Sequence, residues 1–232
     1  MKAPLIIAIA GASCSGKTTV ARELARALGN DSTTILGMDS YYFDLSHLPP
    51  EQVHTQNLDE PEALEHTLLI EHVAALARGD AIEKPVYDHR GHTRVDPETI
   101  EPGSFIIVEG LFALYWEELR RHTQTKVFID TTHDLCLSRR ITRDRNQRGR
   151  SREEVTHRYQ TMVAPMFDRH AWPTREHADL IVNGAGPIDE STAAILLRVG
   201  VGAGGARAGD DTTGCGAEDG GGDSGGGDGG AP

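Results

Sequence analysis

The sequence lacks a disulfide framework, a membrane-spanning run and an excess of basic residues. Its 232 residues include three scattered cysteines, Cys14, Cys136 and Cys215, which fit neither paired disulfides nor a metal motif, so we expect a reducing, cytoplasmic location. No apolar run reaches the roughly 18–20 residues that cross a bilayer, so we expect no membrane partner. The 23 basic and 35 acidic residues give a net charge of −12. This balance argues against nucleic acid or an anionic membrane as a partner.

Glycine and the aromatic residues are unevenly distributed, and the composition changes near residue 200. Residues 200–232 hold fifteen of the 26 glycines, six acidic residues and no aromatic residue. Such a segment has too little apolar surface to offset the entropy lost on ordering it, so we expect a disordered tail. Residues 1–199 have an ordinary composition and suffice for a single domain with one sizeable core.

Predicted strands and helices alternate along residues 1–199. Residues 5–10 form an Ile-rich apolar run typical of a central strand in a parallel sheet, and residues 17–28 follow with helical spacing. Residues 82–87 and 93–100 flank a turn and predict a protruding hairpin. Further strands are predicted over residues 33–38, 104–108, 126–129 and 180–182, and further helices over residues 61–78, 111–121, 133–148 and 187–199. We therefore expect an α/β fold with a doubly wound, mostly parallel sheet and an inserted hairpin.

Residues 11–18 read Gly-Ala-Ser-Cys-Ser-Gly-Lys-Thr and match the pattern G-x-x-x-x-G-K-[ST]. They follow a buried strand and open a helix, as a phosphate-binding loop requires. Backbone N–H groups and the helix N-terminus would bind phosphate oxygens, Lys17 would reach the β- and γ-phosphates, and Thr18 would hold Mg²⁺. The predicted nucleotide-binding residues are Gly11, Ala12, Ser13, Cys14, Ser15, Gly16, Lys17, Thr18 and Thr19.

Two acidic residues and a group of arginines accompany this loop. Glu109 ends the strand 104–108 at the edge where such sheets bind ligands, and could contact the Mg²⁺ or its waters. Asp39 follows the strand 33–38 and could take the proton from an attacking hydroxyl. Six arginines lie within residues 139–150, opposed only by Asp144. They could form a helical lid over a transferring phosphoryl group, and the simpler alternative is a solvated helix face.

These segments together resemble the uridine kinases (uridine–cytidine kinases), a family of P-loop nucleoside kinases. The matching segments are residues 11–19, 39–42, 57–61, 85–88 with 92–94, 108–110, 139–150 and 173–174 with 178–179. They occur in the family order over about residues 4–199. The phosphate-binding loop alone would be unspecific, and the hairpin motif and the Arg-Gly-Arg segment at 148–150 make the resemblance specific.

The resemblance implies phosphoryl transfer from ATP or GTP, with Mg²⁺, to the 5′-hydroxyl of uridine or cytidine, by a homotetramer. It implies that Asp39 is the general base, that Asp59 and Arg140 hold the ribose hydroxyls, and that Tyr87 and His92 read the base edge. The implied catalytic residues are Lys17, Asp39, Arg143 and Arg148. The implied metal neighbours are Thr18, Asp39 and Glu109. The implied substrate-binding residues are Tyr42, Asp59, Tyr87, His92, Arg140, Arg150 and Arg158.

Two positions depart from the family pattern and leave base selectivity open. His89 stands where many relatives carry an aromatic residue that stacks on the base, and Arg158 stands where relatives carry a glutamine. Arg158 could instead pair with Glu154 at the surface, four residues earlier on the same helix.

Two other functions remain as alternatives. A related kinase could act on another hydroxyl acceptor, as phosphoribulokinase or nicotinamide riboside kinase does. A GTP-dependent switch would need an Asn-Lys-x-Asp motif after a later strand, whereas residues 126–129 lead to Asp-Thr-Thr.

Overall fold

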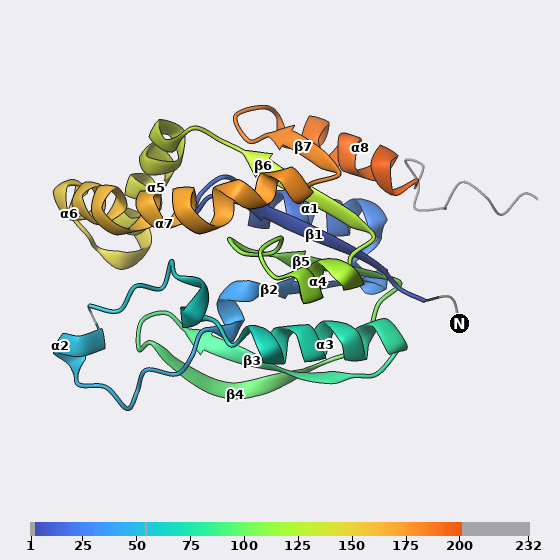
Figure 1. The fold of residues 1–232 in the computed structure, drawn as a ribbon, viewed down its shortest axis with the longest axis horizontal. Helices are drawn as coiled ribbons and strands as arrows, with labels where there is room; N and C mark the ends of the chain where they lie inside the picture. The colour runs from blue at the N-terminus through green and yellow to red at the C-terminus, as the bar shows by residue number, and fades with distance from the viewer. Residues whose placement is uncertain (1–2, 54, 201–232) are drawn as a thin grey trace, which may run out of the picture.

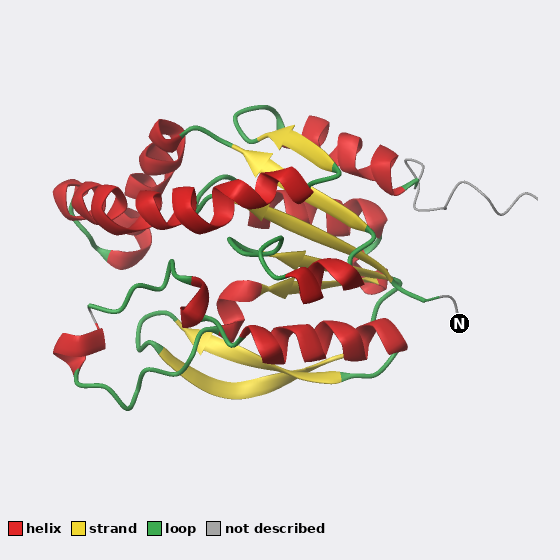
Figure 2. Cartoon of the chain, in the orientation of Figure 1, coloured by secondary structure: helices red, strands yellow, loops and turns green. Residues whose placement is uncertain are grey.

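The computed structural model describes residues 3–53 and 55–200 of the chain. A five-stranded sheet lies at its centre, with strand order β2-β5-β1-β6-β7 and every neighbouring pair parallel (Figures 1 and 2). Its strands are β1 (Leu5–Gly11), β2 (Thr33–Gly37), β5 (Phe105–Glu109), β6 (Thr125–Asp130) and β7 (Leu180–Asn183). The predicted α/β fold is confirmed, and the predicted tail lies outside the described residues from residue 201 onward.

Strand β1 is central because its side chains are apolar on both faces. Ile7 and Ile9 belong to one buried cluster with residues of α1 (Lys17–Leu28) and α8 (Ile188–Val199). Ala8 and Ala10 belong to a second cluster, which includes residues of α3 (His66–Arg78) and α4 (Glu117–His122). Successive side chains of a strand point to opposite faces, so an all-apolar strand fits a sheet covered on both sides.

The remaining helical segments form the ends and connections of the molecule. Helices α5 (His133–Arg148) and α6 (Arg152–Arg158) project at the left of Figure 1, on the same side as α2 (Pro50–Val53). Thr132 caps the start of α5, and Gly149, with φ of 66°, follows its last residue. The other helical segments are η1 (Asn30–Ser32), η2 (Met38–Tyr41), η3 (Pro61–Ala63), η4 (Tyr159–Val163), α7 (Ala164–Met166), η5 (Phe167–Ala171) and η6 (Trp172–His177).

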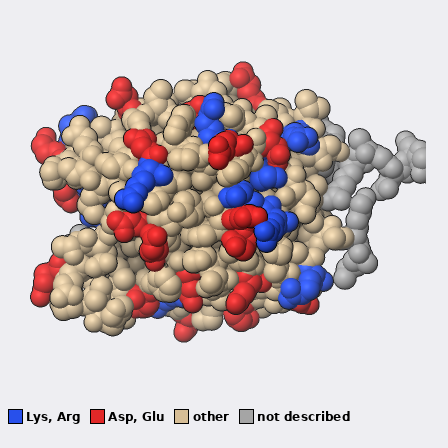
Figure 3. All heavy atoms as spheres, viewed as in Figure 1, with Lys and Arg blue, Asp and Glu red and all other residues tan. Residues whose placement is uncertain are grey.

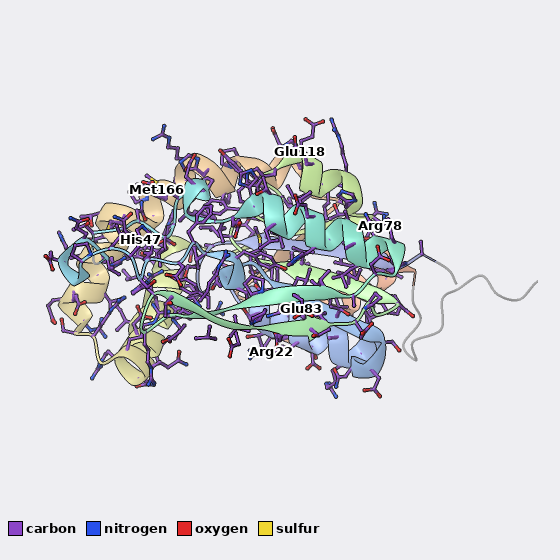
Figure 4. All side chains as sticks on the ribbon, turned by 90° about the horizontal axis from the view of Figure 1, so that it is seen from below. Arg22, His47, Arg78, Glu83, Glu118 and Met166 are labelled. Atoms are coloured by element: carbon purple, nitrogen blue, oxygen red, sulfur yellow. The ribbon has the colours of Figure 1, made fainter. Side chains whose placement is uncertain are left out.

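The predicted hairpin forms a separate two-stranded sheet of β3 (Ile82–Asp88) and β4 (Thr93–Ile100). Figure 4 shows it from below, with Glu83 on β3 and with Arg78 at the end of α3. Asp44 fastens the hairpin to the loop after β2, because its Oδ2 accepts hydrogen bonds from Thr93 Oγ1 and the Arg94 N–H, both at 2.7 Å. The Arg94 side chain donates to the carbonyls of Tyr41 and Tyr42.

Two predicted helices are shorter than the sequence pattern indicated. The predicted helix 61–78 breaks after η3, because Leu64 forms a bridge with Tyr42 and the Glu65 N–H donates to the Tyr41 carbonyl. The predicted helix 111–121 begins only at Glu117. Residues 111–114 are all buried and form a turn.

No helix within the described part of the chain is both long and apolar enough to cross a membrane. On the face drawn in Figure 3, acidic and basic side chains are interspersed.

Candidate active site

The phosphate-binding loop lies between β1 and α1, and glycine is required at two of its positions. A Cβ on Gly11, where φ is 147°, would lie 2.6 Å from the carbonyl oxygen of Ile129. Gly16, with φ of 109°, precedes the first residue of α1. Both backbone conformations are ones that other residues rarely adopt. The loop therefore takes the shape in which its N–H groups can face a phosphate.

A cavity of about 440 Å³ opens over this loop, and we call it the donor cavity. Lys17 Nζ donates to the Ala12 carbonyl at 2.8 Å, so the loop holds the ammonium group at its own backbone. Of the nine predicted nucleotide-binding residues, Gly11 and Ala12 are buried at the start of the loop and Ser13 lines a second cavity. The residues lining the donor cavity are Cys14, Ser15, Gly16, Lys17, Thr18, Thr19, Val20, Arg139, Arg143, Asn183, Gly184, Gly186, Ile188 and Ser191.

Arg139, on helix α5, forms hydrogen bonds to the backbone of the phosphate-binding loop. Its Nη1 donates to the carbonyl of Ser15 at 3.1 Å and to that of Cys14 at 3.4 Å, and its Nη2 donates to that of Gly184 at 2.9 Å. The sequence grouped Arg139 with the other arginines of the lid. The structure instead uses it to join two loops at the edge of the sheet, and the spacing of the arginines contains no signal for this difference.

Thr18 and Glu109 lie together at the carboxyl end of the sheet, as the sequence predicted. Thr18 Oγ1 donates to Glu109 Oε1 at 3.0 Å. Burial raises the pKa of Glu109 above its ordinary value, Lys17 opposes that rise, and the Asp39 carboxylate adds to it. A hydroxyl and a carboxylate are the oxygen ligands that Mg²⁺ takes beside substrate phosphates, so these two residues fit that ion.

The second cavity, of about 90 Å³, lies beside the phosphate-binding loop, and we call it the acceptor cavity. Six of the seven predicted substrate-binding residues line it, together with the predicted catalytic residues Asp39, Arg143 and Arg148. Leu58 lines it as well, and so does His89, which the resemblance places at the base-stacking position; neither was among the predicted site residues. The lining residues are Ser13, Asp39, Tyr42, Leu58, Asp59, His89, His92, Arg140, Arg143, Arg148, Arg150 and Arg158.

Tyr87, the seventh predicted substrate-binding residue, lies behind this wall. Its ring packs against Tyr42 at 5.4 Å and against His89 at 5.1 Å, measured between ring centroids. Its hydroxyl lies 3.5 Å from His92 Nδ1. Burial raises the pKa of Tyr87 to about 12 and lowers that of His89, so both rings favour their neutral forms. One side of the acceptor cavity is therefore an aromatic wall.

Charged groups also line the acceptor cavity. Burial raises the pKa of Asp59, whereas Arg140 and Arg158 lower it. Arg140 Nη1 also donates to Ser13 Oγ at 3.0 Å. Glu154 pairs with Arg150, its Oε1 lying 3.6 Å from Arg150 Nε. The structure thus places Arg158 in the acceptor cavity with Asp59.

Arg143 lines both cavities, and it is the one lining residue that they share within the described part of the chain. It comes from α5, which reaches over the end of β1 where the phosphate-binding loop begins. Its side chain donates to Asp144, a buried carboxylate one residue along the helix. The guanidinium group is thus held at the boundary between a cavity suited to phosphates and a cavity with an aromatic wall.

The parallel sheet, the phosphate-binding loop after β1 and the arginine-rich helix that covers it belong to a P-loop kinase. The model of the phosphoribulokinase/uridine kinase family matches residues 6–189. The chain belongs to this family.

Individual relatives agree with this assignment. A uridine kinase from Geobacillus sp. strain WCH70 is 44% identical over 186 residues, which cover 80% of this chain and 88% of the relative. A uridine kinase from Escherichia coli K12 is 44% identical over 187 residues, 78% of this chain and 88% of the relative. Among solved structures, a fructose transport system kinase candidate from a Silicibacter species superposes with a TM-score of 0.66 at 20% identity. It covers 78% of this chain and 91% of that one, and it supports the fold alone.

Proposed function

We propose that the protein transfers the γ-phosphoryl group of ATP or GTP to the 5′-hydroxyl of uridine or cytidine. One observation carries the proposal: Arg143 joins a phosphate-shaped cavity to a cavity with an aromatic wall. Aromatic rings provide a flat apolar surface for a pyrimidine base, and the relatives named uridine kinase support this choice of acceptor.

On the donor side, the loop and the lid would bind the triphosphate. The loop N–H groups and Lys17 would hold the phosphate oxygens, and Arg143 and Arg148 would neutralise the charge of the transferring group. Thr18 and Glu109, with Asp39 nearby, would hold Mg²⁺. When bound, the metal ion would offset negative charge on the β- and γ-phosphates.

On the acceptor side, Asp39 would accept the proton of the 5′-hydroxyl as that oxygen attacks phosphorus. Asp59 and Arg140 would hold the ribose hydroxyls. His92 would read the base edge, and Tyr87 would fix the orientation of His92 through the contact between its hydroxyl and Nδ1. Tyr42 would support the base from the aromatic wall.

An assay of ADP release against a panel of acceptors tests this proposal. The panel contains uridine, cytidine, adenosine, nicotinamide riboside and ribulose 5-phosphate. We expect turnover with at least one pyrimidine nucleoside and none with ribulose 5-phosphate, which has no ring to place against the aromatic wall. Turnover of ribulose 5-phosphate without turnover of either pyrimidine nucleoside would contradict the proposal.

We also propose a setting for this activity from the family resemblance. Residues 1–199 would be the kinase domain and residues 200–232 a separate tail. The enzyme would act with Mg²⁺ in the cytoplasm, in pyrimidine salvage, as a homotetramer. Light scattering tests the last point, since a tetramer would have four times the 25.1 kDa mass of one chain.

A further inference from the structure

Asp144 is a fully buried carboxylate surrounded by four arginines of the lid. Its Oδ1 lies 2.9 Å from Arg143 Nε and 3.9 Å from Arg148 Nη1. Its Oδ2 lies 3.5 Å from Arg150 Nη1 and 3.7 Å from Arg140 Nε. Four like charges at such distances would repel one another strongly, and one buried acid offsets part of that repulsion.

The two oxygens of this carboxylate are used differently. Oδ1 accepts a hydrogen bond from Arg143. Oδ2 is buried and accepts no hydrogen bond from any described residue, although two guanidinium groups lie within 4 Å. A buried acceptor without a hydrogen bond is costly and uncommon. Small shifts of Arg150 or Arg140 would satisfy it.

The arginines around Asp144 face different parts of the site. Arg143, the hydrogen-bonded partner of Oδ1, lines both cavities. Arg140 and Arg150 near Oδ2, and the more distant Arg148 near Oδ1, line only the acceptor cavity. A substrate that draws Arg140 and Arg150 into place can therefore act on Arg143 through a single carboxylate. The guanidinium groups of Arg140, Arg143 and Arg150 each lie within 4 Å of a carboxylate oxygen of Asp144.

We propose that Asp144 is a positioning residue that couples occupation of the acceptor cavity to the placement of Arg143 at the phosphates. Nucleoside binding aligns Arg150 and Arg140 so that one of them donates to Oδ2, and the fixed carboxylate then orients Arg143 through Oδ1. The coupling is reciprocal, so a bound triphosphate tightens nucleoside binding. The inference rests on the proposed function, since it takes a nucleoside as the ligand of the acceptor cavity.

Calorimetry of uridine binding, with and without a non-hydrolysable ATP analogue and Mg²⁺, measures the coupling. For the wild type we expect the analogue to tighten uridine binding by about fivefold or more, within the usual range of coupling between sites. In Asp144→Asn this factor should fall below about twofold. Asp134→Asn is the matched control, because Asp134 is an exposed acid on the same helix, and it should keep the wild-type factor.

A double-mutant cycle in turnover tests whether Asp144 acts through Arg143. Asp144→Asn should lower kcat by about tenfold or more, and Asp144→Glu should recover part of the loss. In the background of Arg143→Ala, adding Asp144→Asn should change kcat by less than about threefold. If the fold losses in kcat of the two single variants simply multiply in the double variant, the proposal is overturned. It is also overturned if the ATP analogue does not tighten uridine binding in the wild type.

Two further measurements keep a negative result interpretable. Should Asp144→Asn fail to fold in thermal unfolding, Arg150→Gln replaces it, since this change removes a partner of Oδ2 and leaves the Arg143 bond. Full coupling in Arg150→Gln and in Arg140→Gln would then overturn the role of Oδ2. Wild-type turnover of uridine and cytidine is measured first: its absence rejects the proposed function, whereas normal turnover with unchanged Asp144 variants rejects only this inference.

Discussion

Asp39 and Asp59 line the same cavity, but their surroundings differ. Asp39 is exposed. Asp59 is partly buried, and Arg140 and Arg158 oppose the rise that burial causes in its pKa. An exposed carboxylate just after a strand is accessible to an attacking hydroxyl, whereas one beside two guanidinium groups is better suited to accept hydrogen bonds from a ligand. We therefore expect substitution of Asp39 to affect kcat and substitution of Asp59 to affect KM.

The Asp39→Asn variant tests the role of Asp39 as the base. We expect kcat to fall by roughly 10²-fold or more with a modest change in nucleoside KM, because the lost group acts mainly in the transition state. Steady-state kinetics with saturating ATP give both constants. A kcat within about threefold of the wild type would show that Asp39 is not the base.

From the chemistry of Arg158 we predict that the enzyme prefers uridine to cytidine. A guanidinium only donates hydrogen bonds, and uracil has a carbonyl at its 4-position where cytosine has an amino group. Arg158→Gln should therefore reduce the ratio of kcat/KM for uridine to that for cytidine by roughly tenfold. Glu154→Gln is the control: Glu154 forms an ion pair with Arg150 and acts on Arg158 only through its charge, so it tests whether that charge alone sets the preference. A ratio within about twofold of the wild type would mean that Arg158 does not read the base.

From the burial of Glu109 we predict that the Mg²⁺ concentration needed for activity depends on pH. Burial raises the pKa of this carboxyl, so its protonated form persists to a higher pH than for an exposed glutamate. A proton and the metal ion compete for the carboxylate, and the Mg²⁺ concentration for half-maximal activity should rise as the pH falls from about 7.5 to about 5.5. Glu109→Gln should show the weaker pH dependence that ATP alone produces. Equal pH dependence in the two proteins would exclude this role.

The hairpin β3–β4 is the element that carries the aromatic wall, and a few hydrogen bonds place it. Asp44 accepts from Thr93 and Arg94, and these bonds hold its pKa well below the ordinary value. Arg94 in turn donates to the carbonyls of Tyr41 and Tyr42, which closely follow Asp39 in the chain. The position of the aromatic wall against the proposed base therefore depends on one partly buried carboxylate and its hydrogen-bond partners.

Asp44→Ala should loosen this attachment. We expect the KM for uridine to rise by about five- to twentyfold, while the KM for ATP stays within about twofold, because the donor cavity has no residue from the hairpin. Initial-rate kinetics with each substrate varied in turn separate the two constants. Asp96→Ala, an exposed change on the same hairpin, is the control. Equal rises in both constants would contradict a local effect.

The sequence was most informative where a local pattern determines the structure. Helices α1 and α5 begin and end at the predicted residues, because a glycine-rich loop precedes α1 and a capping threonine precedes α5. The places of the phosphate-binding loop and of Glu109 at the ends of strands could likewise be predicted from the sequence, whereas their roles stay predictions. The break before α3 could not, since it depends on a bridge between Leu64 and Tyr42 that only tertiary contact creates.

The sequence also could not show which charged side chains are buried. Asp144 read as a single acid among arginines, and its complete burial depends on α5 packing over the phosphate-binding loop. Arg139 and Arg143 have the same residue type and lie one helical turn apart, yet one holds backbone carbonyls and the other faces two cavities. The two arginines therefore differ in role because they contact different segments of the chain.

At the scale of the whole molecule, residues of the described part of the chain form one buried cluster on each side of the sheet. Residues 201–232 are rich in glycine and aspartate and have little apolar surface to add to either cluster. Deleting residues 201–232, which leaves Gly200 at the end of α8, should change neither kcat nor the melting temperature appreciably. Calorimetry and the uridine assay check this, and a large loss of either would show that the tail contributes to folding or assembly.

The single boundary at Arg143 also bears on inhibitor design. Because the two cavities adjoin there, a compound that joins a pyrimidine nucleoside to a nucleotide through a short phosphate chain could occupy both at once. Its second half would bind as an intramolecular event, at an effective concentration on the order of millimolar for a short linker. The guanidinium would face the middle of that chain, so the phosphate groups of the linker, more than either base, would determine the affinity of such a compound.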